Sequence, residues 1–251
     1  MAHPLTRGMS LDDPKTTELR RYVIREKYFL RLIYKKWYQK ISASLMPDQR
    51  PVLEVGSGGG FMVEFIPGLI TSEVFYISSV ALVLDGLHMP LADNSLGAIV
   101  MINVLHHLTN NVRNFFTNAS RCIRKKGAII MIEPWVTPWS KVIYSKLHHE
   151  PFNPDAAEWE CTKTGPLSGA NSALPWILFS RDRQKFENEF PQWRILQIKP
   201  MMPFIYLLSG GVSMRSFMPE ISFNYWRSLE KALSPWMPYL GMFAQITLQK
   251  R

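Results

Sequence analysis

The clearest chemical signal in this 251-residue chain is a glycine-rich turn that follows a short apolar segment. Residues 54–60 read EVGSGGG, and such a turn lets a ligand approach the backbone because glycine has no side chain to block it. We expect a helix to follow the turn and to direct its free N–H groups at the ligand. The spacing excludes two common nucleotide sites. A dinucleotide fingerprint needs a sixth-position glycine, where Phe61 stands, and a P-loop needs a Gly-Lys-Ser/Thr ending that is absent.

Four segments, in order, resemble the motifs of the class I methyltransferases that use S-adenosylmethionine. Residues 52–60 are similar to the first motif of that family. Residues 85–100 resemble its segment of an acid, a Leu-Pro-Phe-like stretch, a polar turn and an apolar strand, and residues 101–108 and 121–134 resemble the motifs of the fourth and fifth strands. The resemblance covers about a third of the chain. It implies S-adenosyl-L-methionine as the cofactor and methyl transfer as the reaction.

The resemblance also implies which residues surround this cofactor. The glycines of the turn would line its methionine and ribose, and Glu54 would orient the turn or bind the ammonium through water. Asp85 would hydrogen-bond the adenine amino group, while Asn103 and His106 would flank the methionine. The implied cofactor-binding residues are Glu54, Gly56, Ser57, Gly58, Gly60, Ser78, Asp85, Gly86, Leu87, Asn103 and His106.

The second strand departs from the family pattern. In the family this strand usually ends in an acid that binds both ribose hydroxyls, but the apolar stretch 74–77 predicts that it ends here at Ser78 or Ser79. A serine hydroxyl can make one of those hydrogen bonds but not the charge-assisted pair. Only six residues separate Ser78 from Asp85, so we expect no full helix between the second and third strands. A non-catalytic cofactor-binding or scaffold protein is therefore an alternative.

Methyl transfer to an oxygen needs a general base, and the sequence offers a candidate group at His148, His149 and Glu150. Adjacent residues rarely chelate one ion without more distant ligands, so we predict no metal site. A second histidine pair, His106 and His107, follows the predicted fourth strand. For this pair we favour packing and hydrogen bonding over catalysis.

The elements that must position these residues are strands and helices that alternate between residues 50 and 134, which is typical of a doubly wound α/β sheet. Two late segments, 196–199 and 242–249, alternate with period two and predict an antiparallel pair at one edge. We therefore predict a seven-stranded, mixed but mostly parallel sheet of the Rossmann-like methyltransferase type. Cover insertions are expected at about 135–190 and 200–240.

Composition bounds the class and location of the protein. Hydrophobic residues make up 47% and charged residues 20% of the chain, an ordinary globular balance. Two cysteines are too few for a disulfide scaffold or a cysteine zinc cluster. Residues 1–14 lack the apolar core of a signal peptide. These features predict a cytoplasmic protein, and peripheral attachment to a membrane is an alternative that the charge distribution leaves open.

The net charge of +9 is concentrated near the N-terminus, where residues 15–40 hold nine basic and two acidic side chains. Apolar residues recur at three- and four-residue steps over 17–45, which predicts one amphipathic helix with a basic face. We predict a basic helical segment at 1–46 and a methyltransferase domain at 47–251. Such a helix suits packing on the domain, an anionic substrate or an anionic membrane. Nucleic acid is disfavoured because no recognition motif accompanies the charge.

The segment 201–214 is more apolar than a surface loop usually is. We favour a buried lid, and the alternative is a loop that enters a lipid surface together with the basic helix. The sequence therefore predicts methyl transfer to a small-molecule, sugar or lipid-linked acceptor. An RNA methyltransferase is a further alternative, favoured by charge alone.

Overall fold

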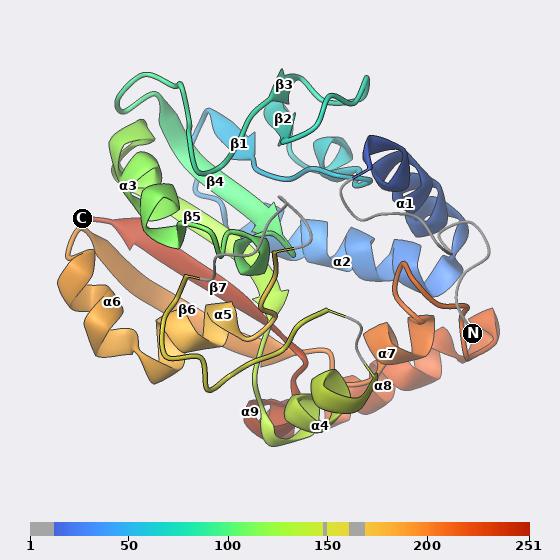
Figure 1. The fold of residues 1–251 in the computed structure, drawn as a ribbon. Coiled ribbons are helices and arrows are strands. Elements are labelled where there is room, and N and C mark those ends of the chain that lie inside the picture. Colours follow the sequence, from blue (N-terminus) through green and yellow to red (C-terminus); the bar gives the residue numbers. More distant parts are fainter. Residues whose placement is uncertain (1–12, 148–149, 161–168) are drawn as a thin grey trace.

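The computed structural model describes residues 13–147, 150–160 and 169–251, which form a three-layered α/β structure (Figure 1). The middle layer is a sheet with the strand order β3-β2-β1-β4-β5-β7-β6. Strands β1 to β5 pair in parallel, and β7 runs antiparallel to both β5 and β6. The predicted mixed, mostly parallel sheet with an antiparallel edge pair is confirmed. The strands are β1 (Val52–Glu54), β2 (Leu69–Glu73), β3 (Leu82–Val83), β4 (Leu96–Ile102), β5 (Ile123–Pro134), β6 (Trp193–Met201) and β7 (Phe243–Lys250).

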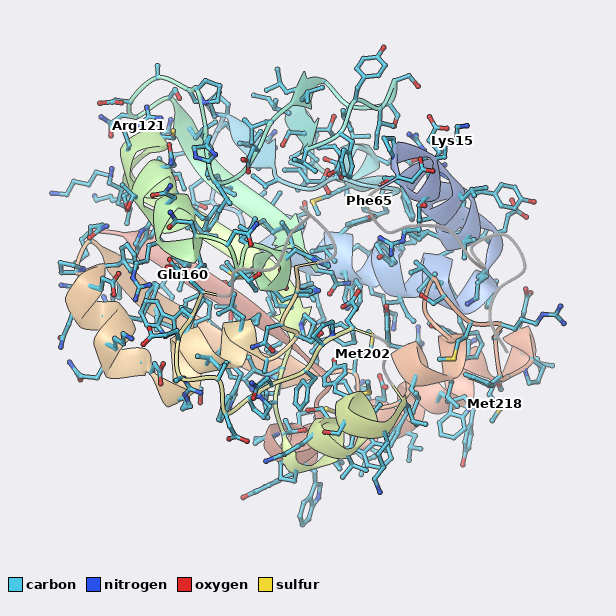
Figure 2. All side chains as sticks on the ribbon, in the orientation of Figure 1. Lys15, Phe65, Arg121, Glu160, Met202 and Met218 are labelled. Carbon is cyan, nitrogen blue, oxygen red and sulfur yellow. The ribbon has the colours of Figure 1, made fainter. Side chains whose placement is uncertain are left out.

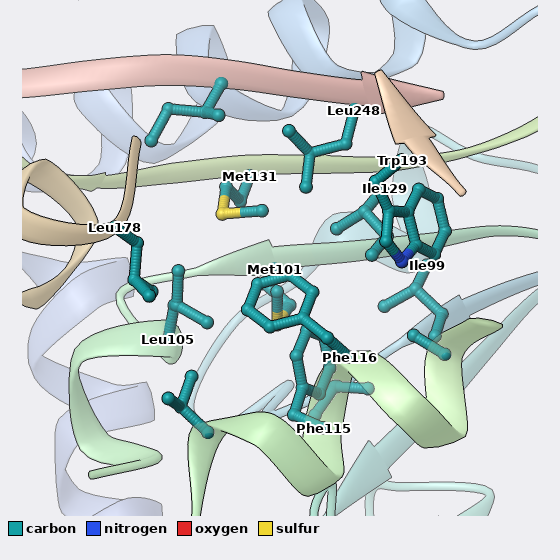
Figure 3. Packing of buried hydrophobic residues seen from close by; sticks show 14 of the residues in the cluster. Ile99, Met101, Leu105, Phe115, Phe116, Ile129, Met131, Leu178, Trp193 and Leu248 are labelled. Atoms are coloured by element: carbon teal, nitrogen blue, oxygen red, sulfur yellow. The ribbon is translucent and has the colours of Figure 1, made fainter. Parts of the chain in front are cut away.

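The central strands are buried on both faces, which is why they read as continuous apolar runs. On β4, Ile99 and Met101 belong to one core cluster and Ala98 and Val100 to the other. Figure 3 shows the first cluster, in which Phe116 and its neighbours on α3 pack against the sheet. The elements on this face are α3 (Val112–Cys122), α5 (Leu174–Trp176), the π-helical turn η3 (Ile177–Arg181) and α6 (Arg183–Glu189).

The N-terminal segment covers the opposite face, but it forms two helices, so the prediction of one helix over 17–45 was wrong. Helix α1 (Pro14–Glu26) and helix α2 (Tyr28–Ser44) are separated at Lys27, whose backbone is extended with ψ 109°. The Lys27 ammonium donates hydrogen bonds to the carbonyl oxygens of Gly211 and Met214, at 2.5 and 2.7 Å. This contact ties the junction of the two helices to the segment 211–214.

The apolar face of α2 lies in the core, and so do two aromatic residues that stand close to basic residues in the sequence. Phe29 is 2% exposed and Tyr38 is 1% exposed. Lys15, in contrast, lies on the outside of α1 (Figure 2). The helices therefore pack on the sheet, and only part of their basic face meets solvent.

Two predicted elements around the glycine turn are corrected. Strand β2 ends at Glu73 and does not occupy 74–77, because it pairs with β1 through Leu69 to Thr71. The chain then turns away, and Tyr76 is 79% exposed. The helix expected after the glycine turn is only the 3-10 turn η1 (Met62–Glu64). Within the described residues no helix connects β2 to β3, as predicted.

The remaining elements cover the carboxyl ends of the strands. In the segment 201–214, Met201, Met202 and Ile205 are buried in the second core cluster, which agrees with a packed lid. None of the helices in the described part of the chain is long and apolar enough to cross a membrane. These elements are η2 (Leu105–His107), α4 (Pro138–Leu147), α7 (Ile205–Ser209), η4 (Glu220–Ser222), α8 (Phe223–Ala232), η5 (Ser234–Trp236) and α9 (Met237–Leu240).

Candidate functional site

A cavity of about 420 Å³ lies where the turns after β1, β3 and β4 meet the ends of β2 and β5. Ligands of open α/β sheets bind at this end of the strands. Helices α1, α2, α4 and α7, the segment 210–214 and the start of β7 contribute further walls. Of the eleven cofactor residues predicted from the sequence, the cavity is lined by ten: Glu54, Gly56, Ser57, Gly58, Gly60, Asp85, Gly86, Leu87, Asn103 and His106.

The glycine turn is shaped for close backbone contact. Gly56 and Gly58 have φ values of +68° and +49°, in the left-handed region that favours glycine. A side chain at Gly59 would collide with the backbone of Arg21, because α1 lies directly on the turn. Helix α1 thus packs on the glycine turn. The helix that we expected after the turn is replaced by the short 3-10 turn η1.

Glu73, at the end of β2, fixes the glycine turn by a hydrogen bond to its backbone. One carboxylate oxygen accepts a hydrogen bond from the Gly58 amide at 2.8 Å, and the other accepts from the Val74 amide at 2.9 Å. Burial raises the pKa of Glu73, and these two hydrogen bonds and the charge of Arg20 oppose the rise. Glu73 is therefore the acid that ends the second strand.

Glu73 was not predicted from the sequence, which suggested Ser78 in its place. Ser78 is exposed and does not line the cavity. The error came from the apolar stretch 74–77, which attracted the strand assignment although the segment before it, LITSE, forms the strand. The signal that could have found Glu73 is its position as the acid that ends that segment.

Glu54 lies beneath the turn and is 4% exposed. It accepts a hydrogen bond from the Ser57 hydroxyl at 2.8 Å, and that hydroxyl accepts one from the Ser72 amide. Burial raises the pKa of Glu54 to about 7; the Ser57 hydrogen bond opposes the rise and the charge of Glu73 adds to it. The side chain therefore ties β1, the turn and β2 together.

Asp85, Gly86 and Leu87 line another part of the cavity, after β3. Asp85 accepts a hydrogen bond from the Leu87 amide at 2.8 Å and lies 2.9 Å from Nδ1 of His88. A side chain at Gly86 would press on Val55, with 3.1 Å between them. The three residues thus form a compact turn with one carboxylate.

Asn103 follows β4 with an unusual backbone, φ +56°. Its side-chain oxygen Oδ1 is buried and, among the described residues, has no hydrogen-bond partner. An unpaired buried acceptor is costly unless a ligand supplies the donor. Together with the Glu73 and Asp85 carboxylates, this oxygen makes the cavity suited to a ligand with hydroxyl and ammonium donors, which S-adenosylmethionine carries.

A buried polar cluster lies beside this region. Nδ1 of His106 is 2.7 Å from Glu133, a fully buried carboxylate that also accepts the amides of Val104 and Leu105. Nε2 of His106 is 3.4 Å from Glu150. Burial lowers the pKa of His106, but hydrogen bonds and charges from Glu133 and Glu150 outweigh it and raise the pKa to about 9.

Only one of the three predicted base residues can be placed. Glu150 lines the cavity and reaches the cluster, whereas His148 and His149 lie outside the described residues. Glu133 was not predicted as a site residue from the sequence. Its signal was an acid at the end of a buried parallel strand, where chemistry is usually positioned.

The rest of the cavity is largely aromatic and apolar. Tyr34, Tyr144 and Tyr206 contribute rings from α2, α4 and α7, and burial raises the pKa of Tyr34 to about 12. Arg20 of α1 is a cation on the same wall, and its charge acts on Tyr34, Tyr206 and Glu73. The cavity therefore combines an apolar wall with a few directed polar groups, as small-molecule sites do.

Comparison with known proteins gives a family match for part of the chain. Residues 53–131 match the family model described as a methyltransferase domain. No curated protein matches the sequence significantly.

The fold is similar to those of solved methyltransferase structures. A SAM-dependent methyltransferase from Archaeoglobus fulgidus is 14% identical, with 91% of this chain and 99% of that chain covered and a TM-score of 0.54. A SAM-dependent methyltransferase from Thermotoga maritima, a possible histamine N-methyltransferase, is 16% identical over 94% of this chain and 99% of that chain, with a TM-score of 0.51. At such low identity, these two likenesses concern the fold.

Proposed function

We propose that this chain, which carries a class I S-adenosylmethionine-dependent methyltransferase domain, methylates a hydroxyl of a small-molecule, sugar or lipid-linked acceptor. The observation that carries the proposal is that one cavity joins the glycine turn, Glu73 and Asp85 to the cluster of His106, Glu133 and Glu150. The first group suits the cofactor. The second suits the reacting end of an acceptor.

The cofactor supplies an activated methyl group on a sulfonium ion. Glu73 would accept hydrogen bonds from the two ribose hydroxyls, and Asp85 would accept one from the adenine amino group. Oδ1 of Asn103 would accept from the ammonium group, which supplies the donor that this buried oxygen lacks. Arg20, whose backbone packs against Gly59, would face the carboxylate of the cofactor.

The acceptor would lie between the tyrosines of α2, α4 and α7, with its hydroxyl against Glu150 and His106. The apolar wall would exclude water and hold the body of the acceptor, and the carboxylate cluster would orient the hydroxyl and favour loss of its proton. A lid-like cover from α1 and the segment 210–214 favours an acceptor small enough to be enclosed, or one whose chain leaves through the mouth of the cavity.

The geometry weakens both alternatives drawn from the sequence. A non-catalytic scaffold was favoured by the missing acid of the second strand, but Glu73 supplies that acid. An RNA acceptor was favoured by the basic N-terminal segment, yet Arg25 pairs with Glu64 and Lys27 binds two carbonyls. Fewer cations are therefore left for a phosphate backbone.

A lipid-linked acceptor would be met at a membrane surface, and we retain this as part of the proposal. The exposed cations Arg31 and Lys35 on α2 and the exposed apolar side chains Ile221 and Trp236 support it. Basic side chains and exposed aromatic residues together favour an anionic lipid surface.

The experiment follows the label from S-[methyl-³H]adenosylmethionine into fractions of a cell extract. We expect label in the low-molecular-mass or lipid fraction, and we expect Glu150→Gln to lower the rate by about a hundredfold or more, the usual size of a proton-transfer contribution. Ser78→Ala, at an exposed position outside the cavity, is the control and should transfer label at the parent rate. Label confined to RNA or protein would contradict the proposal.

A further inference from the structure

Contrary to the expectation of no metal site drawn from the sequence, we propose that the adjacent His106 and His107, together with the distant Glu150, form a binding site for one divalent metal ion of the zinc type. They offer two imidazole nitrogens and one carboxylate oxygen that all lie within 4.8 Å of one another. Two histidines and one carboxylate are a donor set that transition-metal ions bind in catalytic sites. The histidines stand on η2 and Glu150 follows α4, so the fold brings the ligands together from distant parts of the chain.

The spacing between His106 and Glu150 fits two ligands of one ion. Their Nε2 and Oε2 atoms are 3.4 Å apart, whereas Nδ1 of the same ring is 2.7 Å from Glu133. Charge-assisted hydrogen bonds have the shorter distance, about 2.7–2.9 Å. Two ligands that each lie about 2.0–2.2 Å from a tetrahedral ion are about 3.3–3.6 Å apart. The separation of 3.4 Å is therefore long for a charge-assisted hydrogen bond and matches the spacing of two ligands of one ion.

Glu133 orients His106 for this role. Metal-binding histidines almost always donate their second ring N–H to a carboxylate, a carbonyl or water, which fixes the ring and its tautomer. Here Glu133 accepts from Nδ1 of His106 and is itself held by the amides of Val104 and Leu105. An ion that binds here displaces the proton that Nε2 shares with Glu150, and Nε2 then presents its lone pair to the ion while Nδ1 keeps its proton against Glu133.

The ion would keep a coordination position for a further ligand. Three protein ligands leave such a position in catalytic zinc sites, and all three residues line the cavity. The role of that position rests on the proposed function: an acceptor hydroxyl bound there would release its proton to solvent, because coordination lowers its pKa. The metal site itself does not depend on the proposed function.

The test uses the full chain without a histidine tag, treated with a chelator and then titrated with Co²⁺ in the absence of cofactor and acceptor. We expect one ion per chain, the visible absorption of four- or five-coordinate cobalt, and displacement by Zn²⁺. His107→Gln and Glu150→Gln should each weaken cobalt binding by about tenfold or more. His88→Gln is the matched control, because it removes another carboxylate-paired histidine outside the cluster and should leave cobalt binding unchanged.

Absence of a stoichiometric cobalt band, or a band that persists in both cluster variants, would overturn the proposal. Circular dichroism checks that the variants fold, and Glu150→Gln keeps the test available if His107→Gln does not, since the change preserves the shape of the side chain. The outcome is separate from that of the proposed function. Cobalt binding without label transfer would sustain the site alone, and label transfer without cobalt binding would sustain the function alone.

Discussion

At the scale of single residues, the glycine turn of the cofactor region is held by two buried carboxyl groups, those of Glu54 and Glu73. Glu54 is the most buried of those that line the cavity, and its pKa is raised to about 7 by burial. In the unfolded chain its pKa returns to the ordinary value near 4.5. Between these two values the folded protein holds a proton that the unfolded chain has lost.

The free energy of unfolding should therefore fall as the pH rises from about 5 to about 8, with a contribution from Glu54 of about 1–3 kcal/mol. The contribution is present below the unfolded pKa and is lost as the pH passes through about 7. Glu54→Gln cannot ionise and still accepts a hydrogen bond from Ser57, so it should flatten this part of the curve. Urea unfolding of both proteins across the pH range measures the difference.

Glu26→Gln, at an exposed position on α1, is the control for this experiment. It should keep the parent pH dependence. A Glu54→Gln protein that loses stability with pH as steeply as the parent would show that Glu54 does not titrate in this range.

The site residues fall into two groups, those that a local sequence motif predicts and those that only the tertiary structure reveals. The glycines, Asp85 and Asn103 follow motifs that local sequence determines, and the cavity includes them all. Glu73 and Glu133 were missed because their roles come from strand register and from contacts across the sheet, Glu73 with Gly58 and Glu133 with the turn after β4. The sequence marks both residues only as acids that end an apolar strand, and it does not show which backbone amides they bind.

At the scale of elements, the break between α1 and α2 is the feature that shapes the cover. The apolar pattern lapses at Glu26 and Lys27 but resumes at Leu30, and neither Gly nor Pro intervenes, so the sequence suggested one continuous helix. The cause is tertiary, because the Lys27 ammonium binds carbonyls of Gly211 and Met214. The strands, in contrast, were mostly predictable because burial on both faces makes them continuously apolar.

Lys27→Met should lower the free energy of unfolding by about 1–3 kcal/mol, because two carbonyls lose a charged donor. Burial lowers the pKa of Lys27 to about 8, and the cost of burying its charge offsets part of this loss. Lys35→Met, at an exposed position on α2, is the matched control and should change stability little. Equal urea midpoints for the two variants would show that the Lys27 contact contributes nothing.

At the scale of the whole molecule, charge and exposed apolar side chains are unevenly placed. Part of the basic N-terminal segment is used inside the protein, and Arg31 and Lys35 are among the cations that remain exposed. The exposed aromatic residues Tyr225, Trp236 and Tyr239 lie instead in the cover between β6 and β7. A membrane-facing surface would therefore involve this cover more than the buried segment 201–214.

If lipid-linked acceptors are used, the protein should sediment with anionic vesicles at low salt and not with neutral ones. Each cation near such a surface contributes about 1 kcal/mol. Reversal of Arg31 and Lys35 to Glu should therefore weaken sedimentation without changing cofactor affinity. Added salt should also weaken sedimentation, because it screens charges over about 8–10 Å. Sedimentation that ignores both salt and charge reversal would exclude this electrostatic attachment.

The central claim is that S-adenosylmethionine binds against the glycine turn with Glu73 as its ribose acid. Isothermal titration calorimetry of the cofactor into the parent, Glu73→Ala and Ser78→Ala proteins tests it most directly. We predict one site in the parent, unchanged affinity in Ser78→Ala, and a loss of at least about 1.5–3 kcal/mol in Glu73→Ala, the size of a hydrogen bond to a charged group. No binding to the parent protein, or a loss in Ser78→Ala and not in Glu73→Ala, would contradict the account.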